Sequence, residues 1–178
     1  MPGPQLCRQL RDTLSLSSNL ARLLAEVDIP VADDATETIL AALKTLDVHP
    51  DVTPGIGSLA PLAQLITLSN GSTKVAERLL TAAGVRQHFS KILSVDDAPG
   101  WKPARAAYAY AAAQCAHPAH RMLLVAVHPW DIHGAHAAGM RTAWLNRHRG
   151  QYPAYFTTPD LQVPDLPSLA QQLTGTEH

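Results

Sequence analysis

Three short groups of polar residues stand where apolar runs of the sequence end, and their types suit the binding of an anion. The groups are Ser69-Asn70-Gly71, Trp101-Lys102-Pro103 and His128 to Asp131. Hydroxyl, amide and lysine side chains donate hydrogen bonds to a negative ligand, and the free N–H groups of a helix that starts nearby add to the same site. Lys102 precedes the predicted start of a helix, where a positive charge is unfavourable for the helix. This position indicates that Lys102 interacts with some other group.

Each group also has an ordinary structural explanation. Ser69 and Asn70 before a glycine are favoured in a helix-capping turn, and Asp131 stands where it could cap the helix after it. Lys102 could be a solvated surface lysine, which is the common fate of lysines. Only the three groups taken together favour a functional site over these alternatives.

A metal site is not predicted. His128 and His133 lack the i, i+4 spacing of a helical metal pair and have no third ligand nearby, and the other histidines are scattered. Cys7 and Cys115 have no CxxC spacing, so both are interpreted as isolated thiols.

Short apolar runs that alternate with alanine-rich helical stretches predict an α/β fold. Such alternation is typical of a parallel sheet with helices on both faces, whose functional groups gather at the carboxyl ends of the strands. We expect strands at Leu65–Leu68, Lys91–Val95, Met122–Val127 and Thr142–Asn146. We expect helices at Ser72–Ala83, Ala104–Ala116, Ile132–Ala138 and Ser168–Leu173, the first and third of them followed by Gly84 and Gly139.

The two ends of the chain have a different character. Helical periodicity from Leu6 to Leu46 predicts a helical hairpin, and the Pro- and Gly-rich stretch His49–Gly55 predicts a loop that leads into the α/β part. The segment Gln151–Pro167 is Pro-rich, and the short final helix follows it. The resulting prediction is a helical subdomain over residues 1–50 and an α/β core over residues 51–178.

Composition narrows the class of partner. Lys and Arg number 14 against 15 Asp and Glu, which gives a formal net charge of -1 and no electrostatic basis for nucleic-acid or acidic-membrane binding. The longest apolar run, Met122–Val127, is far too short to cross a bilayer. The expected partner is a small molecule, and the expected location is the cytoplasm because the first residues show no signal pattern.

In order and spacing the three polar groups resemble motifs two, three and four of the haloacid dehalogenase superfamily. The Ser-Asn pair is followed about thirty residues later by Lys102-Pro103, and Asp131 follows the next strand. Tyr108, together with Trp130-Asp131 and the run Ala138–Arg147, looks like the 2-haloacid dehalogenase branch. The resemblance extends from about Val52 to the C-terminus, and residues 1–50 look like part of that family's helical cap.

The resemblance implies a hydrolase that displaces halide through an aspartyl-ester intermediate. It implies catalytic roles for Lys102, which pairs with the nucleophile, and Asp131, which orients Lys102 or a water. It also implies that the substrate is bound by Ser69, Asn70, Tyr108, His128 and Trp130. No cofactor is needed for this reaction, whereas phosphatase relatives use the matching acid to bind Mg²⁺. The implied substrate is a small anion. Whether the chain forms a homodimer is left open by the sequence.

Two departures from the family pattern qualify this expectation. Where dehalogenases usually show Ser-Ser-Asn, this chain has Ala126-Val127-His128, so a hydroxyl is lost and an imidazole replaces an amide. In addition, nothing in residues 1–58 reads as an apolar strand ending in Asp-x-x-Gly-Thr, so the nucleophile strand is expected to be absent and this chain to be inactive.

These departures leave three hypotheses. The chain is a truncated family hydrolase, a non-catalytic relative that binds small anions, or an unrelated small α/β module. The third ranks last because the sequence has no glycine-rich phosphate loop. A phosphatase of small phosphate esters remains the alternative within the family.

Overall fold

The computed structural model of the chain describes residues 47–175. These residues belong to one compact unit that begins at Asp47. The predicted helical hairpin and the expected cap over residues 1–50 lie almost wholly outside the described residues.

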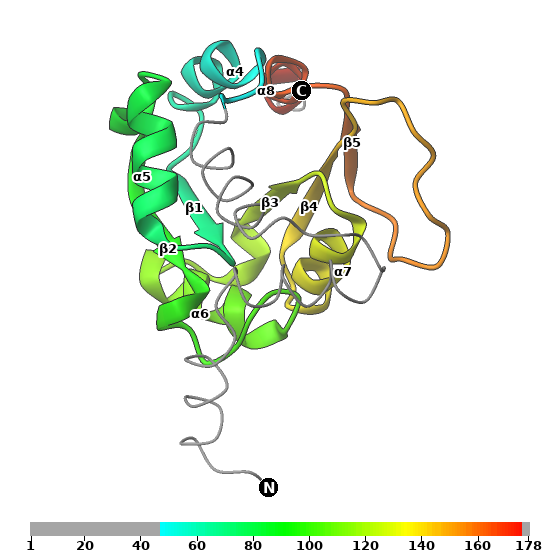
Figure 1. Cartoon of the computed structure of the whole chain (residues 1–178). Helices are drawn as coiled ribbons and strands as arrows, with labels where there is room; N and C mark the ends of the chain where they lie inside the picture. Colours follow the sequence, from blue (N-terminus) through cyan, green and yellow to red (C-terminus); the bar gives the residue numbers. More distant parts are fainter. Residues whose placement is uncertain (1–46, 176–178) are drawn as a thin grey trace, which may run out of the picture. The chain divides into compact units, whose positions relative to one another are not determined.

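The described unit alternates parallel strands with helices, as predicted (Figure 1). Each predicted strand forms, because each is a short apolar run that can be covered on both faces. The strands are β1 (Leu65–Ser69), β2 (Phe89–Ser94), β3 (Leu123–Ala126), β4 (Arg141–Leu145) and β5 (Leu161–Val163). The α-helices are α4 (Val52–Leu59), α5 (Thr73–Ala82), α6 (Arg105–Cys115), α7 (Pro129–Ala137) and α8 (Leu166–Gly175).

All described strand pairs are parallel, but they form two sheets rather than the single sheet expected. One sheet pairs β1 with β2, and the other has the order β3-β4-β5. Residue partners include Ser69 with Ser94 in the first sheet and Ala126 with Trp144 in the second. The expected sheet is divided because no described strand joins β1 to β3.

Glycine ends two of the helices as the sequence predicts. Gly84 follows α5 with φ of 68°, and Gly139 follows α7 with φ of 85°. A left-handed residue at this position lets the chain leave the helix while the last carbonyls stay hydrogen bonded, and glycine adopts it without steric cost. Both helices can therefore turn back directly toward the next strand.

The predicted loop over His49–Gly55 is wrong, because α4 begins at Val52 within it. Pro54 lies in the first turn, where its missing N–H needs no partner, so the proline does not oppose the helix. Gly55 is buried, and a Cβ placed on it would collide with the Cβ of Leu166. Here glycine marks a close contact between α4 and α8 rather than a loop.

The short strand β5 lies within the Pro-rich segment Gln151–Pro167, where no strand was predicted. Asp160, directly before β5, accepts hydrogen bonds from the backbone N–H of Thr142 at 2.7 Å and from its hydroxyl at 2.9 Å. This bonding holds the strand beside β4. A strand of three residues between prolines gives too weak a periodicity to be predicted.

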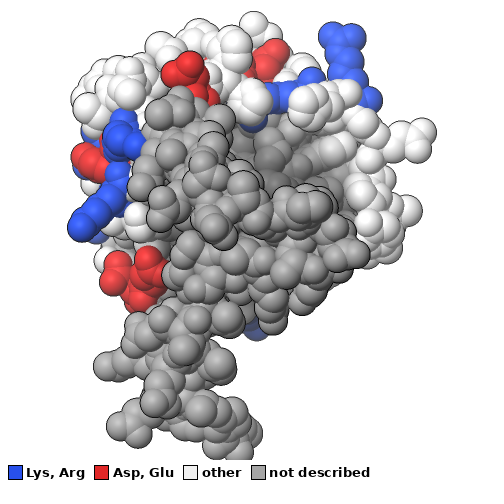
Figure 2. Space-filling view, viewed as in Figure 1, with Lys and Arg blue, Asp and Glu red and all other residues white. Residues whose placement is uncertain are grey.

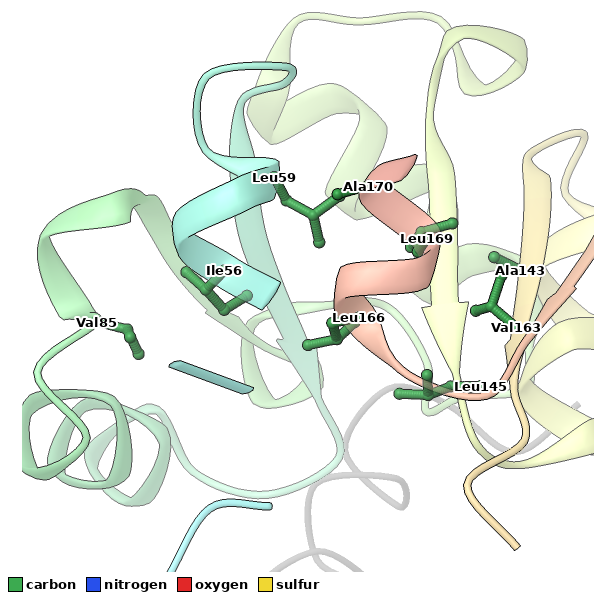
Figure 3. Close-up of a cluster of buried hydrophobic side chains, with 9 residues drawn as sticks. All are labelled: Ile56, Leu59, Val85, Ala143, Leu145, Val163, Leu166, Leu169 and Ala170. Atoms are coloured by element: carbon green, nitrogen blue, oxygen red, sulfur yellow. The ribbon is translucent and has the colours of Figure 1, made fainter. Parts of the chain in front are cut away.

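The main core lies where α4 and α8 cover the sheet. Figure 3 shows Leu166, Leu169 and Ala170 of α8 between residues of α4 and residues of β4 and β5. Burying aliphatic side chains stabilises a fold by roughly 1.5–3 kcal/mol each. The buried members of this cluster are Ile56, Leu59, Val85, Ala143, Leu145, Val163, Leu166, Leu169 and Ala170.

An ion pair ties the start of α4 to distant parts of the unit. Asp51 accepts hydrogen bonds from the Arg147 guanidinium at 2.8 and 3.0 Å and from the backbone N–H of Leu166 at 3.1 Å. The side chains of Asp51 and Arg147 are only 15% and 17% exposed. Burial opposes the charge of Asp51, but these hydrogen bonds and the nearby arginine outweigh it and lower the pKa of the carboxyl.

Charge on the surface is mixed. Figure 2 shows lysine, arginine and acidic side chains scattered in small groups among uncharged residues on the visible part of the described surface. Among the described residues, no helix has both the length and the apolar character needed to span a membrane.

Candidate active site

Lys102 connects the carboxyl ends of the two sheets. Asn70, the first residue after β1, accepts a hydrogen bond from the Lys102 N–H at 3.1 Å and donates one to its carbonyl at 3.2 Å. The Lys102 side chain reaches in the other direction, to Asp131 in the first turn of α7, which follows β3. The lysine is therefore held by its backbone beside β1 and by its side chain beyond β3.

The pair of Lys102 and Asp131 is buried. Lys102 Nζ lies 2.6 Å from Asp131 Oδ2, and the two side chains are 11% and 6% exposed. A surface lysine is thereby excluded, and Asp131 turns toward Lys102 without capping α7, whose cap residue is His128. An ion pair so shielded from water interacts strongly, and removing either partner would leave an unpaired buried charge.

Tyr108 completes the environment of Asp131. Its hydroxyl donates to Asp131 Oδ1 at 2.6 Å, and the residue is fully buried in α6. Burial, together with the hydrogen bond and the negative charge of Asp131, raises the pKa of Tyr108 far above its ordinary value. The hydroxyl therefore remains a donor throughout the pH range in which proteins stay folded, and both carboxylate oxygens of Asp131 have a partner.

Gly134 lets α7 approach this group closely. A Cβ at this position would lie 2.6 Å from the carbonyl oxygen of Pro103 and 2.7 Å from the hydroxyl of Tyr108. No larger residue fits without moving Pro103 or Tyr108, and both adjoin the ion pair. Gly134 was not predicted as a site residue; its signal in the sequence is an isolated glycine inside the expected helix Ile132–Ala138.

An aromatic pair lies beside the lysine. The rings of His128 and Trp130 stack at 5.3 Å between centroids, and Lys102 Nζ lies 5.8 Å from the centre of the Trp130 ring. The second distance is suitable for a cation–π contact. His128 is exposed, while Trp130 is half-buried, so the imidazole stands at the outer side of the group.

Trp144 of β4 was not predicted as a site residue, yet it holds the backbone directly before His128 in place. Its indole N–H donates to the carbonyl of Val127 at 2.9 Å, and its ring packs edge-on against Tyr152. The contact holds the end of β3 in place. Its signal in the sequence, a tryptophan in an apolar strand, does not distinguish it from a core residue.

Most of the predicted residues are brought together by the fold. Lys102, Tyr108, Asp131, Trp130 and Asn70 lie within one group. The amide of Asn70 is engaged with the Lys102 backbone, and the Ser69 hydroxyl accepts from the Gly71 N–H at 2.9 Å. The predicted substrate contacts of Ser69, Asn70, Tyr108, His128 and Trp130 stay predictions.

No group of three histidine, cysteine or acidic side chains suited to hold a metal ion occurs within residues 47–175. A hollow of about 210 Å³ lies at Asn146, Arg149, Gly150, Gln162, Val163 and Pro164, and Lys102 is not among its lining residues.

Fold, motif order and the buried lysine pair together define a class of hydrolase. Residues 5–139 match the family model of haloacid dehalogenase-like hydrolases, so the chain belongs to this family. The match begins far before Val52, where the resemblance was expected to start.

Among characterised relatives, the chain is similar to haloacetate dehalogenase H-2 of Moraxella, with 33% identity over 64% of this chain and 52% of that protein. It is also similar to the (S)-2-haloacid dehalogenase of Pseudomonas sp. strain YL, with 32% identity over 61% of this chain and 47% of that one. The chain thus spans about half the length of these relatives.

The chain is also similar to a solved structure of an L-2-haloacid dehalogenase. It is 30% identical, has a TM-score of 0.80, and is matched over 89% of this chain and 70% of its own. The α/β fold of this family, predicted from the sequence, is confirmed.

Proposed function

We propose that this chain belongs to an enzyme that removes halide from small 2-haloacids by hydrolysis, through an aspartyl-ester intermediate. The observation that carries the proposal is the buried Lys102–Asp131 pair with Tyr108 behind it. The activities for which the relatives are named, haloacetate and (S)-2-haloacid dehalogenation, support the substrate class.

The chemistry needs a fixed positive charge. A carboxylate substrate and a departing halide are both negative, and a lysine shielded from water stabilises such charge more strongly than one in solvent. Asp131 keeps Lys102 in one position, and Tyr108 keeps Asp131 in place by a hydrogen bond that does not titrate. In this proposal Lys102 and Asp131 are the catalytic pair, and Ser69, His128 and Trp130 contact the substrate.

Asn70 has a modified role in this proposal. Because its amide bonds both backbone groups of Lys102, it positions the lysine and is not free to bind the substrate through the same atoms. Ser69 differs, since its hydroxyl accepts one hydrogen bond and retains its own proton for a ligand.

Asp131 is not the nucleophile in this scheme, because both of its oxygens are engaged. The resemblance implies an aspartate at the end of a strand, and the sequence of residues 1–58 contains no such pattern. We therefore propose that the 178-residue chain alone binds the substrate without turning it over.

The phosphatase alternative fits the site less well. Magnesium would need an oxygen of Asp131, yet Lys102 Nζ lies 2.6 Å from one oxygen and the Tyr108 hydroxyl 2.6 Å from the other. A cation already paired with the carboxylate repels a second one. We propose a reaction without a metal.

Ligand binding tests the substrate class. If 2-chloropropionate binds with a Kd near 1 mM, ten times this concentration stabilises the fold by about 1.4 kcal/mol, which raises Tm by about 3–6 °C. Lys102→Gln removes the charge and should abolish the rise. Lys74→Gln changes an exposed lysine of α5 and should leave it intact. No rise, or an equal rise in Lys102→Gln, contradicts the proposal.

Halide release tests the absence of turnover. Incubation of the chain with 2-chloropropionate should release no more chloride than buffer does, as measured with a chloride electrode. Release that disappears in Lys102→Gln but persists in Lys74→Gln would show that the chain holds its own nucleophile.

A further inference from the structure

The hollow of about 210 Å³ lies at the carboxyl ends of β4 and β5. β4 ends at Leu145, and a long connection leads from there to β5 (Figure 1). The hollow is lined by residues from the start of this connection and from the end of β5. Ligands of parallel α/β sheets bind outside the carboxyl ends of the strands. The hollow therefore has the position of a ligand site, although it shares no lining residue with the group around Lys102.

Asn146 fixes the wall of this hollow. Its side chain accepts a hydrogen bond from the Gly150 N–H and donates one to the Gly150 carbonyl, both at 2.9 Å. Its backbone N–H donates to the carbonyl of Val163 in β5 at 2.8 Å, and the residue is buried. These bonds close the loop from Asn146 to Gly150 on itself and attach it to β5. The wall is thus formed by the fold alone and needs no ligand to hold its shape.

Arg149 has a left-handed backbone conformation, with φ of 52°. Glycine adopts this conformation without steric cost, yet the glycine of this loop is the next residue, Gly150. The backbone N–H of Arg149 donates to the Asn146 carbonyl at 3.2 Å, a bond that a glycine would make equally well. Residues held in unfavourable backbone conformations are frequent at functional sites. The arginine at this position therefore indicates a role for its side chain.

Two of the lining side chains have no partner. Neither the Arg149 guanidinium nor the Gln162 amide forms a hydrogen bond or an ion pair within residues 47–175. Arg147 differs, because its guanidinium is paired with Asp51 and it does not line the hollow. Arg149 is thus the one cation among the described lining residues, and no carboxylate neutralises it. Its N–H groups and the amide of Gln162 are available to a ligand.

These groups select a class of ligand. A guanidinium binds a carboxylate through two parallel hydrogen bonds, and a single unpaired cation matches a single negative charge better than the two charges of a phosphate. The amide of Gln162 both donates and accepts, which suits a hydroxyl group. The volume is below the roughly 300 Å³ at which pockets for drug-sized ligands begin, so a molecule of a few carbon atoms is favoured.

We propose that this hollow, which we call the β4/β5 carboxylate site, binds a small monocarboxylate that carries a hydroxyl group. The carboxylate pairs with the Arg149 guanidinium, and the hydroxyl bonds to the amide of Gln162. Hydrolysis of a 2-haloacid yields a 2-hydroxy acid, which belongs to this class. That link to the product rests on the proposed dehalogenation, whereas the site itself does not.

Titration of the ¹⁵N-labelled chain with lactate tests the site. The experiment uses the Lys102→Gln variant, so that binding beside Lys102 does not contribute. The backbone amides of Arg149, Gly150 and Gln162 should shift, with a Kd in the millimolar range. Propionate lacks the hydroxyl and should bind about three-fold or more weakly, and Gln162→Ala should remove this preference for lactate.

Three changes at arginine separate charge from structure. Arg149→Gln should weaken lactate binding about ten-fold or more, because the charged fork is lost. Arg149→Gly also loses binding, although it relieves the left-handed conformation. Its Tm should stay within about 3 °C of that of the parent chain, so unfolding does not explain the loss. Arg78→Gln, at an exposed arginine of α5, should bind lactate as the parent chain does.

Several results would overturn the proposal. One is the absence of shifts at residues 146–150 and 162–164 at lactate concentrations of about 20 mM, well above a millimolar Kd. Another is equal binding in Arg149→Gln, and a third is inorganic phosphate binding as tightly as lactate, which would exclude the assigned ligand class. The dehalogenase proposal is tested through Lys102 and 2-chloropropionate, so its failure leaves all of these readouts unaffected.

Discussion

Replacing Gly134 by alanine tests whether the close approach of α7 maintains the site. In an exposed helix this substitution stabilises by about 1 kcal/mol, because alanine restricts the unfolded chain and favours the helix. At Gly134 the new Cβ would lie 2.6 Å from the Pro103 oxygen, 2.7 Å from the Tyr108 hydroxyl and 2.8 Å from the Pro103 Cβ, where ordinary contact begins at 3.4 Å.

Steric overlap at a buried position costs about 1–3 kcal/mol when the surroundings shift to relieve it. Three simultaneous overlaps, one of them with a backbone atom, place the steric cost of Gly134→Ala toward the upper end of this range. After the gain in helix propensity is subtracted, we expect a net destabilisation of about 1–2 kcal/mol and a fall in Tm of about 2–8 °C. The shift moves Pro103 and Tyr108, so the rise in Tm with 2-chloropropionate should shrink as well.

Gly57 of α4 provides a matched control. A Cβ there meets nothing within 4 Å, so Gly57→Ala should stabilise by about 0.5–1 kcal/mol and leave ligand binding unchanged. Urea unfolding of both variants at constant m-value gives the two free energies. A Gly134→Ala chain as stable as the wild type, with full ligand response, would refute the reasoning.

Two further variants test the polar contacts. Tyr108→Phe leaves Asp131 Oδ1 buried without its donor, so we expect a loss of about 1.5–3 kcal/mol in urea unfolding; a loss below 0.5 kcal/mol would mean that water replaces the hydroxyl. Asp51→Asn should cost about 1–3 kcal/mol at pH 7, because Arg147 and the Leu166 N–H lose a charged acceptor. The pKa of Asp51 is lowered in the fold, so its contribution is complete above the ordinary carboxyl pKa near 4 and is lost as the pH falls below that value. Unfolding curves of wild type and Asp51→Asn should therefore converge in acid, and a constant gap down to pH 2 would contradict this assignment.

The strands were predictable because their signals are strong and local. Apolar runs such as Met122–Val127 favour buried parallel strands. The shared site of Lys102 and Asp131 was implied by the resemblance of their motifs to those of the family. The buried pair confirms that these two residues lie together.

Other features depend on contacts that a single sequence does not reveal. Gly55 looked like a loop residue, but it is glycine because Leu166 of α8 packs against it. The amide of Asn70 looked free to bind a ligand, whereas the fold directs it to the backbone of Lys102. In both cases the partner lies far along the chain, so tertiary packing decides the role.

The bonds of Asp51 have a kinetic consequence. Its partners Arg147 and Leu166 lie 96 and 115 residues away along the chain, so these bonds close loops that span most of the described unit. Contacts of such separation carry a high loop-closure entropy, and we expect them to form after the folding barrier. Asp51 therefore stabilises the completed fold but not the transition state for folding. Its loss should speed unfolding and leave the rate of folding nearly unchanged.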